Sequence, residues 1–235
     1  PMIQSTLSGT PMDLVASAAE GLTWFQLYLC GGKESSIERI KLAKKLKFKV
    51  LVLTIDTTEP GLRESHAAMR PTQALGSIFG MIRVIPQMWF RIRWLCSYFA
   101  GGGMIEFPNV IMKDGSSMPY ADIAAQLRGS SVTWESLAWI REHWDGKIVI
   151  KGIQSVEEAR MAIKLGVDGI SISNHGGRQL DGVRSCLSVL IEVMEELGPQ
   201  LKEAGIEVMF DGGIRDGWSL FKILTYGVKV GGFGR

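Results

Sequence analysis

The residues Gly169-Ile170-Ser171-Ile172, followed by Ser173-Asn174-His175-Gly176-Gly177-Arg178-Gln179-Leu180-Asp181, decide how this chain is interpreted. The apolar run predicts a buried strand, and the polar stretch places a histidine and an arginine at its carboxyl end. In parallel α/β proteins, functional sites are built at that edge of the sheet. The two glycines allow a sharp turn, so His175 and Arg178 can point into one cavity.

His175 and Arg178 together indicate proton abstraction from a small anionic substrate. A neutral imidazole accepts a proton near pH 7, and a guanidinium binds a carboxylate through two parallel hydrogen bonds. The alternative is a surface loop with a capping histidine. The apolar run favours the functional interpretation, because it would bury the start of the loop.

The composition is typical of one large α/β domain. The chain has 235 residues, 26 of them basic and 24 acidic, and a net charge of +2 does not indicate nucleic-acid binding. Its three cysteines are far apart and show no metal-binding spacing, which favours a reducing cytosol. No signal peptide is recognisable at the N-terminus, and no uncharged apolar run is long enough to span a bilayer.

Strands and helices alternate along most of the chain. Strands are predicted at residues 2–5, 24–29, 49–56, 147–152, 168–173, 207–211 and 228–233. Helices are predicted at 10–21 with Thr10 as cap, 35–46, after the cap 133–136, 155–165, 187–197 and 218–226. The helix at 155 opens with a capping box, Ser155 to Glu158. This alternation predicts a parallel sheet.

Polar side chains follow the carboxyl ends of five of these strands: Gln26 and Tyr28, Thr54 and Asp56, Lys151, Ser173 and His175, and Asp211. A site spread over so many strand ends favours a closed (β/α)8 barrel over a doubly wound sheet, where it concentrates at one switch point. Seven strands leave an eight-stranded barrel one short, so we expect the chain to be a fragment.

Two glycine-arginine segments near the end predict a phosphate site. Asp211-Gly212-Gly213-Ile214-Arg215 and Gly231-Gly232-Phe233-Gly234-Arg235 each follow a strand. Barrels often bind phosphate after the seventh and eighth strands, where glycine backbones approach closely. Arg215 and Arg235 would add charge-assisted hydrogen bonds. The alternative is tight-turn glycines beside solvated arginines.

These motifs resemble those of the FMN-dependent α-hydroxy acid dehydrogenase/oxidase family, which includes glycolate oxidase, lactate oxidase, lactate monooxygenase and mandelate dehydrogenase. The matching segments are Phe25–Tyr28, Thr54–Asp56, Lys151-Gly152, Ser173–Asp181, Asp211–Arg215 and Gly234-Arg235. They occur in family order over almost the whole chain. The resemblance implies one FMN-binding TIM barrel domain over residues 1–235, here without the first strand and the last helix.

The resemblance also implies roles by position. His175 would be the base with Asp56 as its partner, Arg63 and Arg178 would bind the substrate carboxylate, and Tyr28 would hydrogen-bond the substrate. Lys151 would face the flavin N1 and C2 carbonyl. The implied ligands of the flavin ring and ribityl chain are Ser5, Gln26, Thr54 and Ser173. Those of the ribityl and phosphate end are Asp211, Gly213, Arg215, Gly234 and Arg235.

The implied reaction is the oxidation of an L-2-hydroxy acid to a 2-oxo acid, with electrons leaving as a carbanion or as a hydride. They would pass through FMN to oxygen or to a membrane or protein carrier. One alternative is a larger, peptide-derived substrate. Another is a non-catalytic flavin- or phosphate-binding barrel, which would lack His175 or the arginine pair. We expect a homo-oligomer, a tetramer for the complete protein, located in the cytoplasm.

The segment from about residue 65 to 118 interrupts the alternation. It contains Arg70, Arg83, Arg91 and Arg93 and no acidic residue from 65 to 105. Within residues 78–100, Trp89, Phe90, Trp94 and Leu95 could form the apolar face of an interfacial helix at the inner face of a membrane, with arginines toward lipid phosphates. The alternative, from the resemblance, is a lid over the active site or a contact between subunits.

Overall fold

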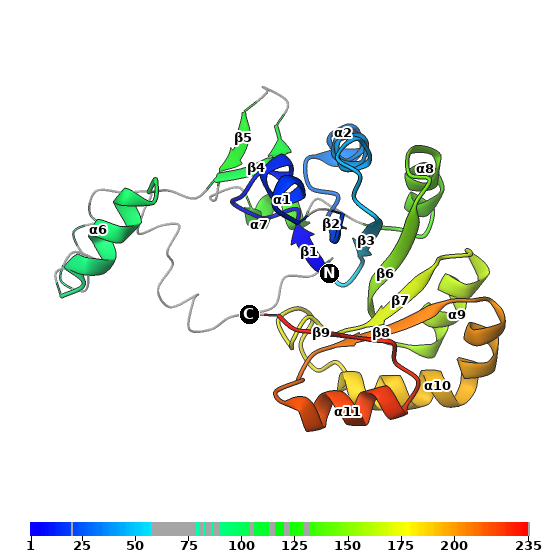
Figure 1. Cartoon of the computed structure of the whole chain (residues 1–235). Helices are drawn as coiled ribbons and strands as arrows, with labels where there is room; N and C mark the ends of the chain where they lie inside the picture. The colour runs from blue at the N-terminus through cyan, green and yellow to red at the C-terminus, as the bar shows by residue number, and fades with distance from the viewer. Residues whose placement is uncertain are drawn as a thin grey trace.

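The computed structural model describes residues 1–19, 21–57, 79, 82, 86, 90–103, 106–112, 116–119, 123–128 and 132–234. Within these residues seven parallel strands form one curled sheet in the order β1-β2-β3-β6-β7-β8-β9 (Figure 1). The strands are β1 Met2–Ser5, β2 Thr23–Leu27, β3 Val50–Thr54, β6 Lys147–Ile153, β7 Gly169–Ile172, β8 Glu207–Asp211 and β9 Val230–Gly232. The fold is a (β/α)8 barrel of which seven strands are present, as predicted.

The helices cover one face of this sheet (Figure 1). They are α1 Met12–Ala19, α2 Gly32–Lys45, α8 Ser136–His143, α9 Val156–Lys164, α10 Cys186–Glu203 and α11 Gly217–Thr225. Leu51 and Leu53 pack against the helices in the main core, whereas Val50 and Val52 belong to a smaller cluster on the opposite face. Alternate residues of one strand are therefore buried on both sides, as expected for a parallel strand in a barrel.

Two helix starts test the predicted caps. At α1 the N–H of Met12 donates to Asn109 Oδ1 over 3.0 Å, so a residue distant in sequence accepts a bond at the position where Thr10 was expected to cap. At α9 the capping box is confirmed. Ser155 Oγ accepts from the Glu158 N–H at 3.2 Å, and Glu158 Oε2 accepts from the Gln154 N–H at 2.7 Å.

The predicted insertion contains structure that the sequence pattern did not indicate. Two strands, β4 Glu106–Ile111 and β5 Ser117–Pro119, pair antiparallel, and α7 Ile123–Arg128 follows. This β4–β5 hairpin lies beside α1 (Figure 1). Ser35 Oγ donates to the Ile111 carbonyl at 3.0 Å, and the Gly31 N–H donates to Gln126 Oε1 at 2.9 Å. The hairpin is thus bonded to the first turn of α2, and α7 to the turn between β2 and α2.

Candidate active site

His175 meets Asp56 and Tyr28 at the carboxyl edge of the sheet. Its Nδ1 lies 3.2 and 3.3 Å from the two carboxylate oxygens of Asp56, and its Nε2 lies 3.4 Å from the Tyr28 hydroxyl. The Asp56 side chain is fully buried and the His175 side chain is 26% exposed. A proton on Nδ1 satisfies the buried carboxylate, so in this tautomer the Nε2 lone pair faces the Tyr28 hydroxyl and is available to a base's chemistry there.

The backbone of His175 is held in a left-handed conformation, with φ of 58°. Gly176 and Gly177 continue with φ of 66° and 71°, which confirms the predicted sharp turn. The His175 N–H donates to Ser173 Oγ at 3.1 Å, and the Gly177 N–H donates to the Asn174 carbonyl at 2.9 Å. Residues other than glycine adopt this conformation uncommonly, histidine more often than most, and these hydrogen bonds stabilise it here.

Lys151, Ser173 and Asp211 form one network at the ends of β6, β7 and β8. Lys151 Nζ donates to Ser173 Oγ at 2.7 Å and pairs with Asp211 Oδ2 at 2.9 Å, and Ser173 Oγ donates to Asp211 Oδ1 at 2.6 Å. Both charged side chains are about four-fifths buried, so this pair is weakly screened. Ser173 also accepts from the His175 N–H, which joins the network to the turn.

A second chain of hydrogen bonds crosses the tips of the first three strands. Ser5 Oγ donates to Gln26 Oε1 at 3.0 Å, and Gln26 Nε2 donates to Thr54 Oγ1 at 2.9 Å. Gln26 and Thr54 are buried at the carboxyl ends of their strands. These three predicted residues come together, although β1, β2 and β3 are well separated in sequence.

Gly152 is a structural requirement that the sequence interpretation missed. Its φ is 104°, and a Cβ at this position would lie 2.7 Å from Cβ and Cγ of Asp56. The absence of a side chain therefore lets the buried carboxylate approach β6. The pair Lys151-Gly152, at the carboxyl end of an aliphatic strand, was the available signal, because glycine in a strand often marks a close approach.

Other predicted residues are not joined to this cluster by described contacts. Arg178 is exposed and forms no hydrogen bond or ion pair within the described part of the chain. Arg215, Gly213 and Gly234 are exposed, and a Cβ on either glycine would meet open space. Arg63 and Arg235 lie outside the described residues. Among those that are described, no group of three or more His, Cys, Asp or Glu side chains could hold a metal ion.

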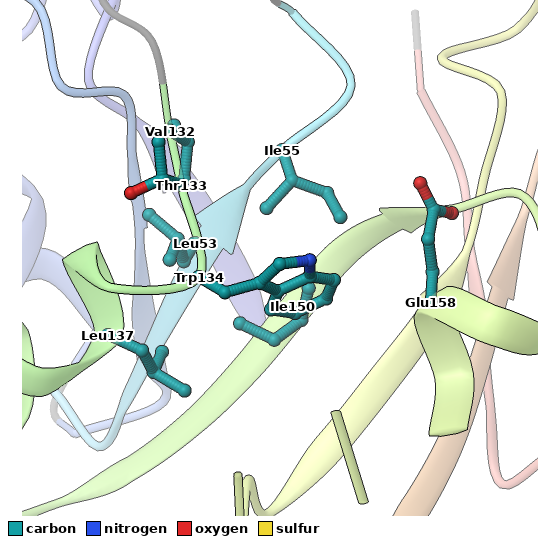
Figure 2. A pocket seen from close by; sticks show the side chains of 8 residues that line it. All are labelled: Leu53, Ile55, Val132, Thr133, Trp134, Leu137, Ile150 and Glu158. Carbon is teal, nitrogen blue, oxygen red and sulfur yellow. The ribbon is translucent and has the colours of Figure 1, made fainter. Parts of the chain in front are cut away.

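A small cavity lies on the other face of the sheet from the polar cluster. It has a volume of about 140 Å³ and is lined by Leu53, Ile55, Val132, Thr133, Trp134, Leu137, Ile150 and Glu158. Figure 2 shows Trp134 beside Ile150, with Glu158 farther off at the start of α9. Leu53 and Ile150 belong to the core beneath the helices, so this cavity is separate from the His175 cluster.

Comparison with known proteins gives matches over the whole chain. A family model described as "FMN-dependent dehydrogenase" matches residues 1–235. L-lactate dehydrogenase of Pseudomonas putida (strain GB-1) is 33% identical over 240 residues, which cover 100% of this chain and 60% of that protein. L-lactate dehydrogenase of Xanthomonas campestris pv. campestris (strain 8004) is 34% identical, with 100% and 59% covered. The chain thus spans about 60% of the length of these curated relatives.

Solved structures also match almost the whole of this chain. (S)-mandelate dehydrogenase, described as a monotopic membrane protein, matches with a TM-score of 0.82 at 30% identity, over 99% of this chain and 60% of that one. Mandelate oxidase matches with a TM-score of 0.69 at 26% identity, over 99% and 55%.

Proposed function

The chain belongs to the family of FMN-dependent dehydrogenases, and we propose that the whole protein oxidises an L-2-hydroxy acid to the corresponding 2-oxo acid. One observation carries the proposal: the buried Asp56 carboxylate holds His175 through Nδ1, and Nε2 is turned toward the Tyr28 hydroxyl. A base in this position removes a proton from the substrate, and Asp56 then stabilises the imidazolium that forms. FMN, when bound, supplies the acceptor for the two electrons.

Tyr28 supports the same assignment. Burial, and to a lesser extent the nearby Asp56 carboxylate, raise the pKa of its phenol well above the ordinary value. The hydroxyl therefore keeps its proton across the physiological range and can donate a hydrogen bond to a substrate oxygen next to His175. We assign substrate carboxylate binding to Arg63 and Arg178, on the basis of their positions in the family motifs.

The residues present fit FMN. Ser5, Gln26 and Thr54 offer amide and hydroxyl groups of the kind that a flavin ring, with alternating donors and acceptors, requires. Lys151 provides a largely buried cation, and its Nζ has two described partners for three N–H groups. We assign Lys151 to the flavin N1 and C2 carbonyl, with Ser173 and Asp211 beside it. The open space at Gly213 and Gly234, with Arg215 and Arg235, would accommodate the phosphate.

A non-catalytic flavin-binding barrel is the alternative. It would need the Lys151 network but not the Asp56–His175 pair, whose buried carboxylate costs free energy to desolvate. Whether the substrate is small, as the names of the lactate and mandelate relatives imply for those proteins, or larger and peptide-derived is decided by experiment.

The test is anaerobic reduction of the flavin in the whole protein. We expect the purified protein to be yellow, to release FMN on denaturation, and to lose its oxidised-flavin absorbance when L-lactate, (S)-mandelate or glycolate is added. Bound flavin that no hydroxy acid and no 2-hydroxyacyl peptide reduces would overturn the proposed activity and favour the non-catalytic barrel.

We also propose that α6, Ile92–Ala100, binds a membrane surface. The helix has no buried residue, and Phe90, Trp94 and Phe99 are 88, 54 and 70% exposed. Figure 1 shows α6 apart from the sheet. Arg91 and Arg93 are exposed beside the aromatic side chains, as in helices that lie in a lipid interface. No helix in the described residues is long and apolar enough to cross a membrane, so the proposal concerns surface binding. Such an enzyme would pass its electrons to a membrane carrier.

A further inference from the structure

Arg39 is a buried cation that the catalytic description has not used. It lies on α2 with 3% of its surface exposed, and it shares the buried helix face with Ser36, Ile40 and Ala43. These positions follow the helical spacing i, i+3, i+4 and i+7, which places an arginine where a core residue is expected. Within the described residues no carboxylate forms an ion pair with it.

The guanidinium donates hydrogen bonds to groups just after β2 and at the start of α2. Nη2 donates to the carbonyl oxygens of Tyr28 at 3.2 Å and Cys30 at 2.6 Å, and to Ser36 Oγ at 2.8 Å. Nη1 donates to Ser35 Oγ at 3.0 Å. Burial lowers the pKa of Arg39 to about 10, which still leaves it charged at neutral pH. Burying a cation without a carboxylate partner costs folding free energy. A role in function would account for an arginine at this position.

These hydrogen bonds bind the chain just beyond the last backbone pairing of the sheet. The β2–β3 ladder ends at the pair Leu27 and Leu53, so the Tyr28 carbonyl lies beyond the last sheet pairing. The Tyr28 N–H donates to Thr6 Oγ1 at 3.1 Å, and its carbonyl accepts from Arg39. Both backbone polar groups of Tyr28 are therefore fixed, one from β1 and one from α2. The chain then turns away at Gly31, which has φ of 77°.

We propose that Arg39 is a positioning residue for catalysis: its fork fixes the Tyr28 backbone so that the phenol hydroxyl stays 3.4 Å from His175 Nε2. This inference rests on the proposed function through the role given to Tyr28. The Tyr28 ring packs among Phe107, Val110 and Met118 of the β4–β5 hairpin, which allows it little freedom once its backbone is set. If the backbone moves, the packed ring cannot rotate to compensate, and the hydroxyl moves with it.

Arginine suits this task because one planar group reaches several acceptors at once. Two carbonyls and two hydroxyls surround it: Nη2 shares its two N–H groups among the carbonyls and Ser36 Oγ, and Nη1 donates to Ser35 Oγ. A lysine ammonium is a compact donor on a flexible stem and would not hold both carbonyls in the same geometry. Arg39→Lys therefore keeps the charge and removes the fork.

The test is a double-mutant cycle in the whole FMN-loaded protein. Arg39→Lys is expected to lower kcat/KM for the best hydroxy acid about 10- to 100-fold, as for a misplaced substrate-binding group. In a Tyr28→Phe background the same change should cost less than about twofold, because the hydroxyl through which Arg39 acts is already absent. Lys41→Met, which removes an exposed cation of the same helix, is the control and should leave kcat/KM unchanged.

Two outcomes overturn the inference: an unchanged kcat/KM in Arg39→Lys, or a loss of the same size with and without the Tyr28 hydroxyl, which would mean a purely structural role. If Arg39→Lys does not fold, Ser36→Ala removes one acceptor that orients the guanidinium and is tested in the same cycle. If the wild-type protein oxidises no hydroxy acid, the proposed function fails by itself. Crystal structures of wild type and Arg39→Lys then test the positioning role separately. A Tyr28 hydroxyl that moves away from His175 in the variant supports that role, and one that stays in place contradicts it.

Discussion

At the scale of single residues, the left-handed conformation of His175 determines which replacement reports on its chemistry. Asparagine tolerates φ near 60° better than alanine does, so His175→Asn should keep the turn, and with it the Ser173 bond, while removing the base. We expect the variant to retain FMN and to reduce it about 10²- to 10⁴-fold more slowly with hydroxy acid. Stopped-flow absorbance under anaerobic conditions measures this rate, and an unaltered rate would remove His175 from the mechanism.

Gly152 supports the second residue of the pair. In Gly152→Ala the new Cβ would meet Asp56 at 2.7 Å, and the φ of 104° is unfavourable for alanine. We expect a loss of roughly 1–3 kcal/mol of unfolding free energy together with slower flavin reduction, because Asp56 must shift away from His175. Gly166→Ala is a matched control, since its φ is 64° and its Cβ would meet open space. It should lose stability through backbone strain alone and keep the full reduction rate.

At the scale of the helix, the start of α9 predicts a pH dependence of stability. Burial, more than the nearby Asp56, raises the pKa of Glu158, although N–H groups of residues 154 and 155 oppose the shift. A carboxyl group whose pKa is raised in the folded state contributes stability below its unfolded pKa. That contribution is lost as the pH rises through its folded pKa. Glu158→Gln cannot ionise and still accepts the Gln154 N–H, so it should avoid this loss.

Thermal melts of wild type and Glu158→Gln at about pH 4 and pH 8 measure the effect. The melting temperature of the variant should rise relative to that of wild type as the pH increases. Glu157→Gln, on the same turn but exposed, controls for the removal of a charge near the helix start. A pH-independent difference, or one shared by both variants, would contradict the prediction.

The exposed aromatic side chains of α6, together with Phe90 just before it, predict binding to lipid. The whole protein should sediment with anionic vesicles at low salt and less at high salt, since each exposed arginine near such a surface contributes about 1 kcal/mol. Replacing Phe90, Trp94 and Phe99 with serine should abolish sedimentation. Trp218→Ser removes an aromatic that is 73% exposed on a different helix and serves as the control. Binding that survives the triple replacement would favour the lid or a subunit contact instead.

At the scale of the whole molecule, local sequence patterns predicted the parts of the fold built from short-range connections. The aliphatic runs predicted all seven strands of the sheet, and the residues at their tips, such as Gln26 and Lys151, converge as expected. The β4–β5 hairpin was missed because its shorter strand has three residues, too few to show a period. The contact between Asn109 and the start of α1 joins residues 97 apart, and no local pattern encodes such a partner.

The buried arginine shows a different limit. The helical spacing of α2 indicated that Arg39 is buried, because it lies on the same face as Ile40 and Ala43. A basic residue, however, is ordinarily assigned to a solvated face. The carbonyl groups that bind it are set by where the β2–β3 ladder ends, which depends on tertiary pairing. Roles for Arg178, Gly213, Arg215 and Gly234 stay predictions, since the described contacts do not join them to the cluster.

The pairing of β3 with β6 divides the sheet into two halves with different folding histories. Strands β1, β2 and β3 follow one another in sequence, as do β6, β7, β8 and β9, but residues 55–146 separate the halves. Each half can form by closing short loops, whereas joining them closes a long one, which is slower. Asp56 belongs to the first half and His175 to the second, so their contact forms only when the halves meet. In refolding of the whole protein, flavin reduction by substrate should therefore recover after helical circular dichroism.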